Sequence, residues 1–370
     1  MGKPITDGPG SMFGAFFRVA DVNGDNKTDI IFSDYSISQV TVILGTGTWV
    51  STDYSSISSS RIITITKYGD FGYAIDTGDV NGDGITDILI GSTHGLTCVV
   101  YGRSDLSSMS VSGLPSVYGY KISEFSTDIG SIIRILQDIN GDGVRDMYLG
   151  SVSFGSMRGY VVYGQNGTTR TGVNLLAVWQ YNGYTLYGVT LSSTASDAGD
   201  VDGDGINDFM VGSRPDAASY VVYGSLGTRN NMDLSTIDRF ADFKIVANPG
   251  PSEDGFALGG RDLNGDGIPD LVAGTIYEYA ENPIYAIYGT RSRNSSIITA
   301  PDLAPDKGYV VPQARIDGMS RSAIGDVNDD GGYDLILYFM SSSEILVIKG
   351  YSLYTSLILT ISFPFSPSQP

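Results

Sequence analysis

The sequence is poor in the residues that disulfides, zinc sites and catalytic triads require. Its 370 residues contain one cysteine, Cys98, and one histidine, His94. A single cysteine excludes an internal disulfide framework and a cysteine-based zinc site. A single histidine excludes centres with several histidine ligands, and it leaves only His94 for a Ser-His-Asp triad. The chemistry of this chain therefore has to come from its other side chains.

Long apolar runs and basic runs are also missing. No apolar stretch approaches the 18 residues of a membrane-spanning helix, so none is predicted. The N-terminal residues Met1-Gly2-Lys3-Pro4 lack the apolar core of a signal peptide. This fits either a chain that is not secreted by that route or a mature or truncated chain. Because no basic cluster could neutralise phosphates, no nucleic-acid partner is expected.

Aspartate is the abundant acid. The chain has 36 Asp against 5 Glu, 48 Gly and a net charge of −19. A solvated helical face would use Glu at least as freely, whereas Asp is typical of turns and of sites for hard cations. Hydrophobic residues make up 41% of the chain, which is enough for a buried core and argues against disorder.

One Asp-rich motif recurs six times along the chain. The copies begin 58 to 64 residues apart and read DVNGDNKTD from Asp21, DVNGDGITD from Asp79, DINGDGVRD from Asp138, DVDGDGIND from Asp200, DLNGDGIPD from Asp262 and DVNDDGGYD from Asp326. A short apolar run follows each copy at once, and a second run ends in a Gly that lies 23 to 27 residues after the first Asp. Short apolar runs beside Gly-rich turns indicate buried strands.

This periodicity predicts an all-β fold. Four short strands in each of six repeats of about 60 residues are typical of the blades of a β-propeller. We therefore predict one domain over residues 1–370, with six four-stranded blades (a seventh, degenerate blade stays possible) and one loop for Ca²⁺ in each blade. The predicted repeats span residues 11–68, 69–126, 127–188, 189–252, 253–316 and 317–370, and Leu357–Phe363 would be the last outer strand.

The repeated motif places oxygen ligands at positions 1, 3, 5 and 9, with the backbone carbonyl of position 7 as a further donor. Six to eight oxygens are what Ca²⁺ requires, and Gly or Asn at position 6 allows the positive φ of a tight loop. An EF-hand is excluded because position 12 is apolar in every copy. The remaining alternative is a set of β-turns with solvated Asp, although several convergent carboxylates without a cation would repel one another.

The predicted metal residues are those at positions 1, 3, 5, 7 and 9 of the six copies. They are Asp21, Asn23, Asp25, Lys27, Asp29, Asp79, Asn81, Asp83, Ile85, Asp87, Asp138, Asn140, Asp142, Val144, Asp146, Asp200, Asp202, Asp204, Ile206, Asp208, Asp262, Asn264, Asp266, Ile268, Asp270, Asp326, Asn328, Asp330, Gly332 and Asp334. They include 19 Asp, and without these the 22 remaining acidic residues equal the 22 basic ones. The whole net charge of −19 is therefore assigned to the loops, and six bound Ca²⁺ ions would leave about −7.

The loops resemble the FG-GAP repeats of integrin α-subunit propellers and related calcium-binding proteins. Phe13-Gly14 and Phe71-Gly72 stand where that family has its Phe-Gly, and Gly91-Ser92 and Gly150-Ser151 hold the Gly-Ala-Pro place. The resemblance implies a propeller that binds about six structural Ca²⁺ ions, each between the first and second strands of a blade. Integrin propellers have seven blades, whereas six repeats are present in this chain.

The same resemblance implies a face for ligands opposite the calcium loops, formed by the loops between second and third strands. Aromatic and basic residues of these loops could anchor a protein or a glycan: Tyr35, His94, Phe154, Arg158, Arg214, Tyr277 and Tyr279. Asn166 and Asn294 begin glycosylation sequons after third strands. The expected function is that of a binding or adhesion module, extracellular or at the cell surface and not an enzyme. The alternative is an architectural subunit of an extracellular assembly or filament.

Overall fold

Strands account for nearly all the secondary structure of the computed structural model. The described residues are 16–47, 54–67, 69–93, 96–123, 129–150, 158–214, 218–239, 243–246, 254–276, 282–291, 297–299, 303–314, 322–339, 344–350 and 359–362. Within them the helical elements are short 3-10 helices: η1 (Tyr54–Ser56), η2 (Ser59–Arg61), η3 (Val111–Gly113), η4 (Leu175–Tyr181) and η5 (Leu234–Arg239). No helix among these residues is long and apolar enough to cross a membrane.

The first three sheets lie in the first of two compact units, which comprises residues 1–138, 142–186 and 228–232. Each sheet has five strands, ordered from its first strand outward. Sheet one is β1 (Phe17–Ala20), β2 (Asp29–Asp34), β3 (Gln39–Ile43), β4 (Ile62–Thr66) and β8 (Met109–Ser110). Sheet two is β5 (Phe71–Gly78), β6 (Asp87–Ser92), β7 (Leu96–Val100), β9 (Gly119–Ser123) and β13 (Val173–Asn174). Sheet three is β10 (Ile132–Ile135), β11 (Met147–Gly150), β12 (Gly159–Val162), β14 (Gly183–Tyr187) and β18 (Met232–Asp233).

The other three sheets lie in the second unit, which comprises residues 139–141, 187–227 and 233–370. Sheet four is β15 (Thr190–Gly199), β16 (Asp208–Arg214), β17 (Ala218–Val222), β19 (Phe243–Val246) and β23 (Ile297–Thr299). Sheet five is β20 (Asp254–Arg261), β21 (Asp270–Ile276), β22 (Asn282–Ile287) and β24 (Gly308–Ala314). Sheet six is β25 (Ser322–Gly325), β26 (Asp334–Phe339), β27 (Glu344–Ile348) and β28 (Leu359–Ser362).

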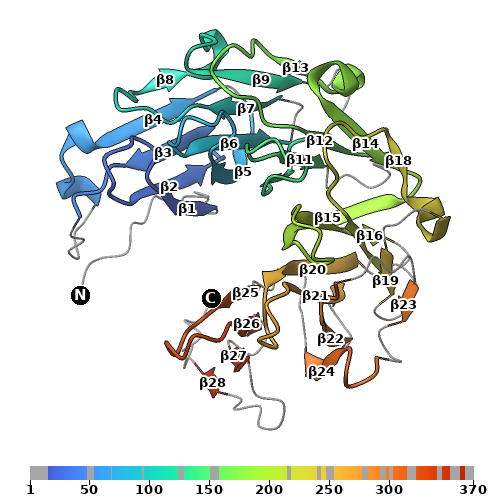
Figure 1. Ribbon diagram of the computed structural model, residues 1–370. Helices are drawn as coiled ribbons and strands as arrows, with labels where there is room; N and C mark the ends of the chain where they lie inside the picture. Colours follow the sequence, from blue (N-terminus) through green and yellow to red (C-terminus); the bar gives the residue numbers. More distant parts are fainter. Residues whose placement is uncertain are drawn as a thin grey trace, which may run out of the picture. The chain divides into compact units, whose positions relative to one another are not determined.

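The first four strands of each sheet form an antiparallel meander that comes from one repeat, so the sheets are the blades of a β-propeller (Figure 1). The described residues contain six of them, one for each copy of the motif. The outer strand of sheet six, β28, lies within the segment 357–363 in which it was predicted, and it pairs with β27. The prediction of a single domain over residues 1–370 stays a prediction.

The prediction of four strands per blade is wrong for four of the sheets, which gain a fifth strand from the following repeat. Strands β8, β13 and β23 pair in parallel with the outer strands β4, β9 and β19. Each added strand has only two or three residues, too few for an alternating pattern to be visible in the sequence. Because an open strand edge invites pairing with other chains, the added strand protects the rim of the blade.

The apolar runs after the motif are most deeply buried where the second strand packs on both faces. In β6, Ile88 and Ile90 join a core with sheet one, whereas Leu89 between them joins a core with sheet three. In the second unit, Leu271 and Val272 of β21 likewise face sheets four and six. A strand with two buried faces needs no polar alternation, which explains the continuous runs.

A Gly ends the third-strand segment of every repeat because the chain passes against the motif there. These are Gly45, Gly102, Gly164, Gly224, Gly289 and Gly350. A Cβ atom on any of them would lie 2.1 to 2.3 Å from the carbonyl oxygen of motif position 8 in the same repeat. That separation is shorter than any van der Waals contact allows, so only Gly lets the two segments meet.

Replacing this Gly should therefore destabilise the blade. Gly102→Ala places a methyl group 2.2 Å from the Thr86 carbonyl oxygen, and we expect the free energy of unfolding to fall by about 2 kcal/mol or more. Gly113→Ala is the matched control in the same repeat, because a Cβ there meets nothing within 4 Å. It should change the free energy of unfolding by less than about 0.5 kcal/mol. Urea unfolding measures both, and equal effects would contradict the steric explanation.

Candidate functional site

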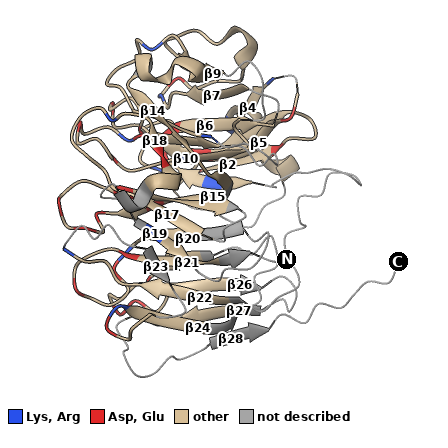
Figure 2. Ribbon diagram, turned by 90° about the vertical axis from the view of Figure 1, so that its right-hand side faces the viewer, with Lys and Arg blue, Asp and Glu red and all other residues tan. Residues whose placement is uncertain are grey.

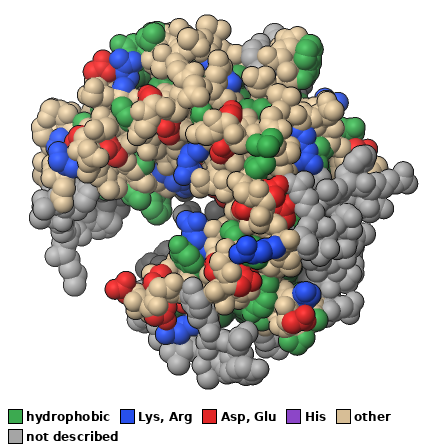
Figure 3. Space-filling model, viewed as in Figure 1, with side chains coloured by type: hydrophobic (Ala, Val, Ile, Leu, Met, Phe, Trp, Pro, Cys, Tyr) green, Lys and Arg blue, Asp and Glu red, His purple; other side chains and the backbone are tan. Residues whose placement is uncertain are grey.

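Each copy of the motif forms the loop between the first and second strands of a sheet, as predicted. Loop two, for example, runs from the end of β5 at Gly78 to the start of β6 at Asp87. The loops are numbered one to six in chain order. Figure 2 shows acidic residues in red, many of them in loops at the ends of strands. On the face drawn in Figure 3, acidic and basic side chains are interspersed rather than separated by sign.

The Asp at position 9 is the buried base of each loop. Asp29, Asp87, Asp146, Asp208, Asp270 and Asp334 are all 0% exposed. One oxygen of each accepts the N–H of the strand-end Gly at 2.7 to 3.1 Å. In five loops the other oxygen accepts the N–H of position 2, as Asp87 does from Val80 at 2.9 Å. This carboxylate therefore joins the motif to the end of the third strand.

The Asp at position 1 accepts hydrogen bonds from backbone N–H groups of the turn. In all six loops its Oδ2 accepts the N–H of position 6 at 2.7 to 2.8 Å. Position 6 has positive φ throughout, including 61° at Asn26, as the sequence predicted. Position 4 also has positive φ, a requirement that the sequence analysis missed, and Asp329 adopts 61° there in loop six. Asp and Asn are the non-glycine residues that best tolerate this conformation.

The side chains of positions 3 and 5 also accept hydrogen bonds from the backbone of the turn. In every loop the N–H of position 7 donates to Oδ1 of the position 5 Asp at 2.8 to 2.9 Å. In five loops the N–H of position 5 donates to Oδ1 of position 3. The side chains predicted as ligands thus share one small turn in each loop, and in loop four three of their carboxylates converge. The carbonyls of position 7 stay predicted donors.

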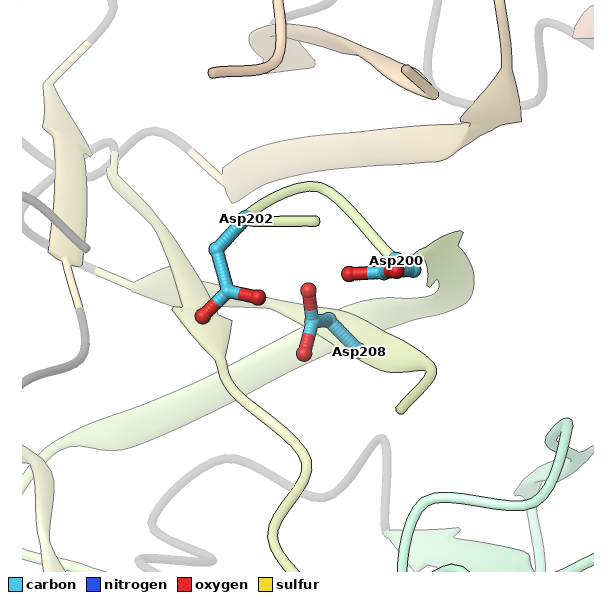
Figure 4. A group of neighbouring side chains, drawn as sticks. All are labelled: Asp200, Asp202 and Asp208. Carbon is cyan, nitrogen blue, oxygen red and sulfur yellow. The ribbon is translucent and has the colours of Figure 1, made fainter. Parts of the chain in front are cut away.

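Loop four carries the densest group of carboxylates. Oxygens of Asp200, Asp202 and Asp208 lie within 4.8 Å of one another, and Figure 4 shows the three side chains turned toward a common point. No other group of three or more acidic, His or Cys side chains of this kind occurs among the described residues. The difference comes from position 3, which is Asp202 in this loop and Asn in the other loops.

Burial makes the position 9 carboxylates of loops two, four and five costly to ionise. Desolvation raises the pKa of Asp87 and of Asp208 to about 8 and that of Asp270 to about 7, against the two backbone hydrogen bonds that each accepts. The charges of Asp202 and Asp200 raise the pKa of Asp208 further. In loop six, by contrast, the N–H of Gly331 is the main group that lowers the pKa of Asp326.

The donor set of the loops fits calcium. Oxygens bound to one Ca²⁺ at 2.3–2.6 Å can be at most about 5 Å apart, and the carboxylates of loop four meet that limit. All the side-chain donors are oxygens, the ligand type that hard cations prefer. The backbone N–H groups occupy only part of the acceptor capacity of each carboxylate, because each oxygen has two lone pairs. The same residues could therefore hold both the turn and an ion.

The apolar residue at position 2 is a second feature that the sequence analysis missed. In loops one to five it is 0 to 3% exposed, whereas Val327 of loop six is 54% exposed. Its carbonyl accepts a backbone N–H from the following blade. The bonds run from Arg103 to Val22 at 3.0 Å, from Gln165 to Val80 at 3.1 Å and from Thr290 to Val201 at 3.0 Å. The sequence did offer a signal for this feature, because position 2 is Val, Ile or Leu in all six copies.

The residues predicted for a ligand face are only partly described. Tyr35 is half-buried at the turn after β2, and Arg158 is exposed just before β12. Arg214 ends β16, but its side chain lies outside the described residues, as do His94, Phe154, Tyr277 and Tyr279. Cys98 is fully buried in β7, and burial raises the pKa of its thiol to about 12.

Of the two predicted glycosylation sites, Asn166 is exposed and Asn294 lies outside the described residues. The sequon of Asn166 rests on loop two, since the N–H of Gly167 donates to the carbonyl of Asn81 at 2.7 Å. A Cβ on Gly82 would lie 2.3 Å from Oδ1 of Asn166. Glycosylation at either residue stays a prediction.

Comparisons with known proteins agree with this repeat. A family model described as FG-GAP-like repeat matches residues 21–90. Integrin alpha-PS2 of Drosophila melanogaster is 27% identical over 275 residues, covering 66% of this chain and 18% of the integrin. Integrin alpha-V of Gallus gallus is 25% identical over 254 residues, covering 63% of this chain and 23% of the integrin. The chain thus spans about a fifth of the length of these relatives.

Among solved structures, a chain of the crystal structure of BBS1N in complex with ARL6DN, soaked with mercury, is similar in fold. Its TM-score is 0.52 at 10% identity, over 95% of this chain and 83% of that chain. At such low identity the likeness concerns the fold alone. The repeated loops, the six sheets and the similarity in sequence together show a β-propeller whose repeats resemble FG-GAP repeats and those of integrin α subunits.

Proposed function

We propose that this chain is a calcium-stabilised binding module of the adhesion type, which works outside the cell or at its surface. The observation that carries the proposal is the sixfold recurrence of a loop that is closed by backbone hydrogen bonds to its Asp side chains and has a buried Asp at its base, together with the three carboxylates that converge in loop four. The sequence similarity to integrin α subunits supports the adhesion class.

The role proposed for calcium is structural. When bound, the ion would supply positive charge at the centre of each loop and offset the repulsion among its carboxylates. The residues themselves close the loop through backbone hydrogen bonds to positions 1 and 9. A catalytic metal centre would more typically be unique and retain an open position, so we propose that the chain is not an enzyme.

The ligand face proposed is the end of each sheet opposite its calcium loop. Every second strand runs away from a calcium loop, so the turn that follows it lies at the other end. In sheet one, β2 leads from Asp29 to the turn at residues 35–38. Loops of this kind carry the aromatic and Arg residues suited to anchoring a protein or a glycan.

A second candidate function is that of an architectural subunit, in which blade edges make the contacts. Trp179 and Leu176 of η4, beside the outer strand β13, are 68% and 55% exposed. Exposed large apolar side chains on an outer edge favour contact with another protein surface.

Calcium content and stability test the metal assignment. We expect about six Ca²⁺ per purified chain, and a large fall in melting temperature on chelation, because a site filled at 100 times its Kd adds about 2.7 kcal/mol to the free energy of unfolding. Cys98 offers a second readout, since its buried thiol should react with a thiol reagent faster after chelation. An unchanged melting curve and thiol reactivity in EDTA would refute a structural role for calcium.

Loop four allows a sharper test, because Asp202→Asn gives its position 3 the Asn that the other five loops have. Without calcium, this variant should melt at a higher temperature than the parent chain, since one charge leaves a buried cluster of like charges. With calcium it should bind the ion more weakly in loop four and lose that advantage. Asp306→Asn, at a 75% exposed side chain, is the control and should change neither value. Equal shifts with and without calcium would contradict the assignment.

An adhesion experiment distinguishes binding through the proposed ligand face from contact through the outer edge of a blade. The immobilised, calcium-loaded chain should bind cells or members of a glycan array, and Arg158→Ala combined with Tyr277→Ala should abolish this binding. Lys307→Ala, at an exposed side chain in the second unit, should leave it intact. Loss of binding or of assembly in Trp179→Ser alone would favour the architectural alternative and would count against the loop face.

A further inference from the structure

A pocket of about 650 Å³ lies in the first unit at the end of sheet one opposite calcium loop one. The turn between β2 and β3 and the connection from β4 to β5 form its walls. Its lining residues are Tyr35, Ser36, Ile37, Ser38, Thr66, Lys67, Gly69, Asp70 and Ser110. A volume of 300–1,000 Å³ is typical of sites for small ligands. Of these residues, the sequence analysis singled out only Tyr35.

Hydrogen bonds between the two walls fix the pocket in advance of any ligand. The backbone N–H of Lys67 donates to the carbonyl of Ser38 at 3.3 Å, and the Ser38 hydroxyl donates to the carbonyl of Gly69. The turn itself is held by Asp34, whose carboxylate accepts the N–H of Ser36 at 3.1 Å and the Ser36 hydroxyl. A preformed pocket binds without the entropy cost of ordering its loops.

Lys67 brings a positive charge to the pocket, whose lining also holds the carboxylate of Asp70. Its ammonium group makes no ion pair or hydrogen bond with the described residues, although the chain has a net charge of −19. Burial lowers the pKa of Lys67, and the positive charge of Lys121 lowers it further. Lys121 donates to the carbonyl of Ser112 at 2.7 Å, which is a neutral partner. An anionic group on the ligand would give the ammonium group of Lys67 an ion-pair partner.

The rest of the lining combines an aromatic ring with a dense set of hydroxyl groups. The Tyr35 ring packs against Tyr73, with 5.4 Å between ring centroids, and Ile37 beside it is 61% exposed. Asp70, which also lines the pocket, accepts the Thr93 hydroxyl at 2.6 Å. Aromatic faces suit the C–H faces of a sugar ring, and carboxylate and hydroxyl groups suit its hydroxyls. An acidic peptide would use the lysine but few of these hydroxyl partners.

We propose that this pocket binds a sugar that carries an acidic group. The carboxylate or sulfate lies at the ammonium group of Lys67, the ring lies on Tyr35 and Ile37, and the sugar hydroxyls bond to the serine and threonine hydroxyls of the lining. This inference rests on the proposed function, because it assigns a ligand class to one part of the loop face.

Titration of the calcium-loaded chain with defined sugars tests the proposal. The probes are 3′-sialyllactose for a carboxylate, a heparin-derived tetrasaccharide for sulfate, and lactose as the neutral control. At least one acidic sugar should bind with a Kd on the order of 1 mM or tighter, and lactose should bind at least tenfold more weakly, by calorimetry or ligand-observed NMR. Which acidic probe binds distinguishes carboxylate from sulfate.

Two variants locate the site. Lys67→Gln should weaken binding of the acidic sugar at least tenfold without changing that of lactose, and Lys307→Gln should bind like the parent chain. The melting temperature of each variant in calcium serves as the check on folding. If Lys67→Gln lowered it, Lys67→Arg would replace it and should retain binding of the acidic sugar.

The proposal would be overturned by a lack of binding of either acidic sugar, by equal binding of lactose, or by unchanged binding in Lys67→Gln. Equal affinity for a hexaglutamate peptide would also overturn it, because the pocket would then recognise charge and not a sugar. A chain that supports adhesion through Arg158 and Tyr277 but binds no acidic sugar would refute the pocket alone. The proposed function would fail separately, by the absence of calcium or of adhesion.

Discussion

The fold of every repeat depends on one buried carboxylate. The Asp at position 9 has no exposed surface, and it accepts a backbone N–H from the start of the motif and another from the Gly at the end of the third strand. A buried carboxylate without such partners would be strongly unfavourable. Two hydrogen bonds that join distant parts of a repeat therefore set the register of three strands, and they explain why Asp87 and Gly102 have counterparts in all six copies. The same carboxylate sits at the base of the loop proposed for calcium, so the framework and the metal site share a residue.

Much of this organisation was predictable from the sequence because it is repeated. The six loops, their position between first and second strands, and the outer strand near Leu359 follow from spacing, apolar runs and Gly residues. The positive φ at Asn26 followed from residue type. The fifth strands did not follow, since a pair such as Met109–Ser110 is too short to carry a periodic signal and belongs to another repeat than the strand it joins. The pocket around Lys67 also could not be found, because its walls come from segments about thirty residues apart that hydrogen bonds bring together.

The acidity of the chain takes on a different meaning in this structure. The Asp residues are concentrated where backbone N–H groups and neighbouring carboxylates share small loops, while the charges on the face in Figure 3 are mixed. Lys67 lies away from the acidic loops, in a pocket that it shares with Asp70, and its ammonium group makes no ion pair with the described residues. One end of sheet one thus carries the Asp side chains of loop one, and the other end carries an ammonium group and hydroxyls.

The short strands passed from one repeat to the preceding sheet have a consequence for how such a protein can be divided. The outer edge of sheet one is completed by Met109 and Ser110, which are encoded in the second repeat, and that of sheet two by Val173 and Asn174 from the third. A gene segment cut at the repeat boundaries would therefore encode a blade that lacks its outermost strand and carries a short strand that belongs to the preceding blade. The smallest transferable module is one repeat together with about the first three quarters of the next, so the unit of duplication in the sequence is offset from the unit of structure.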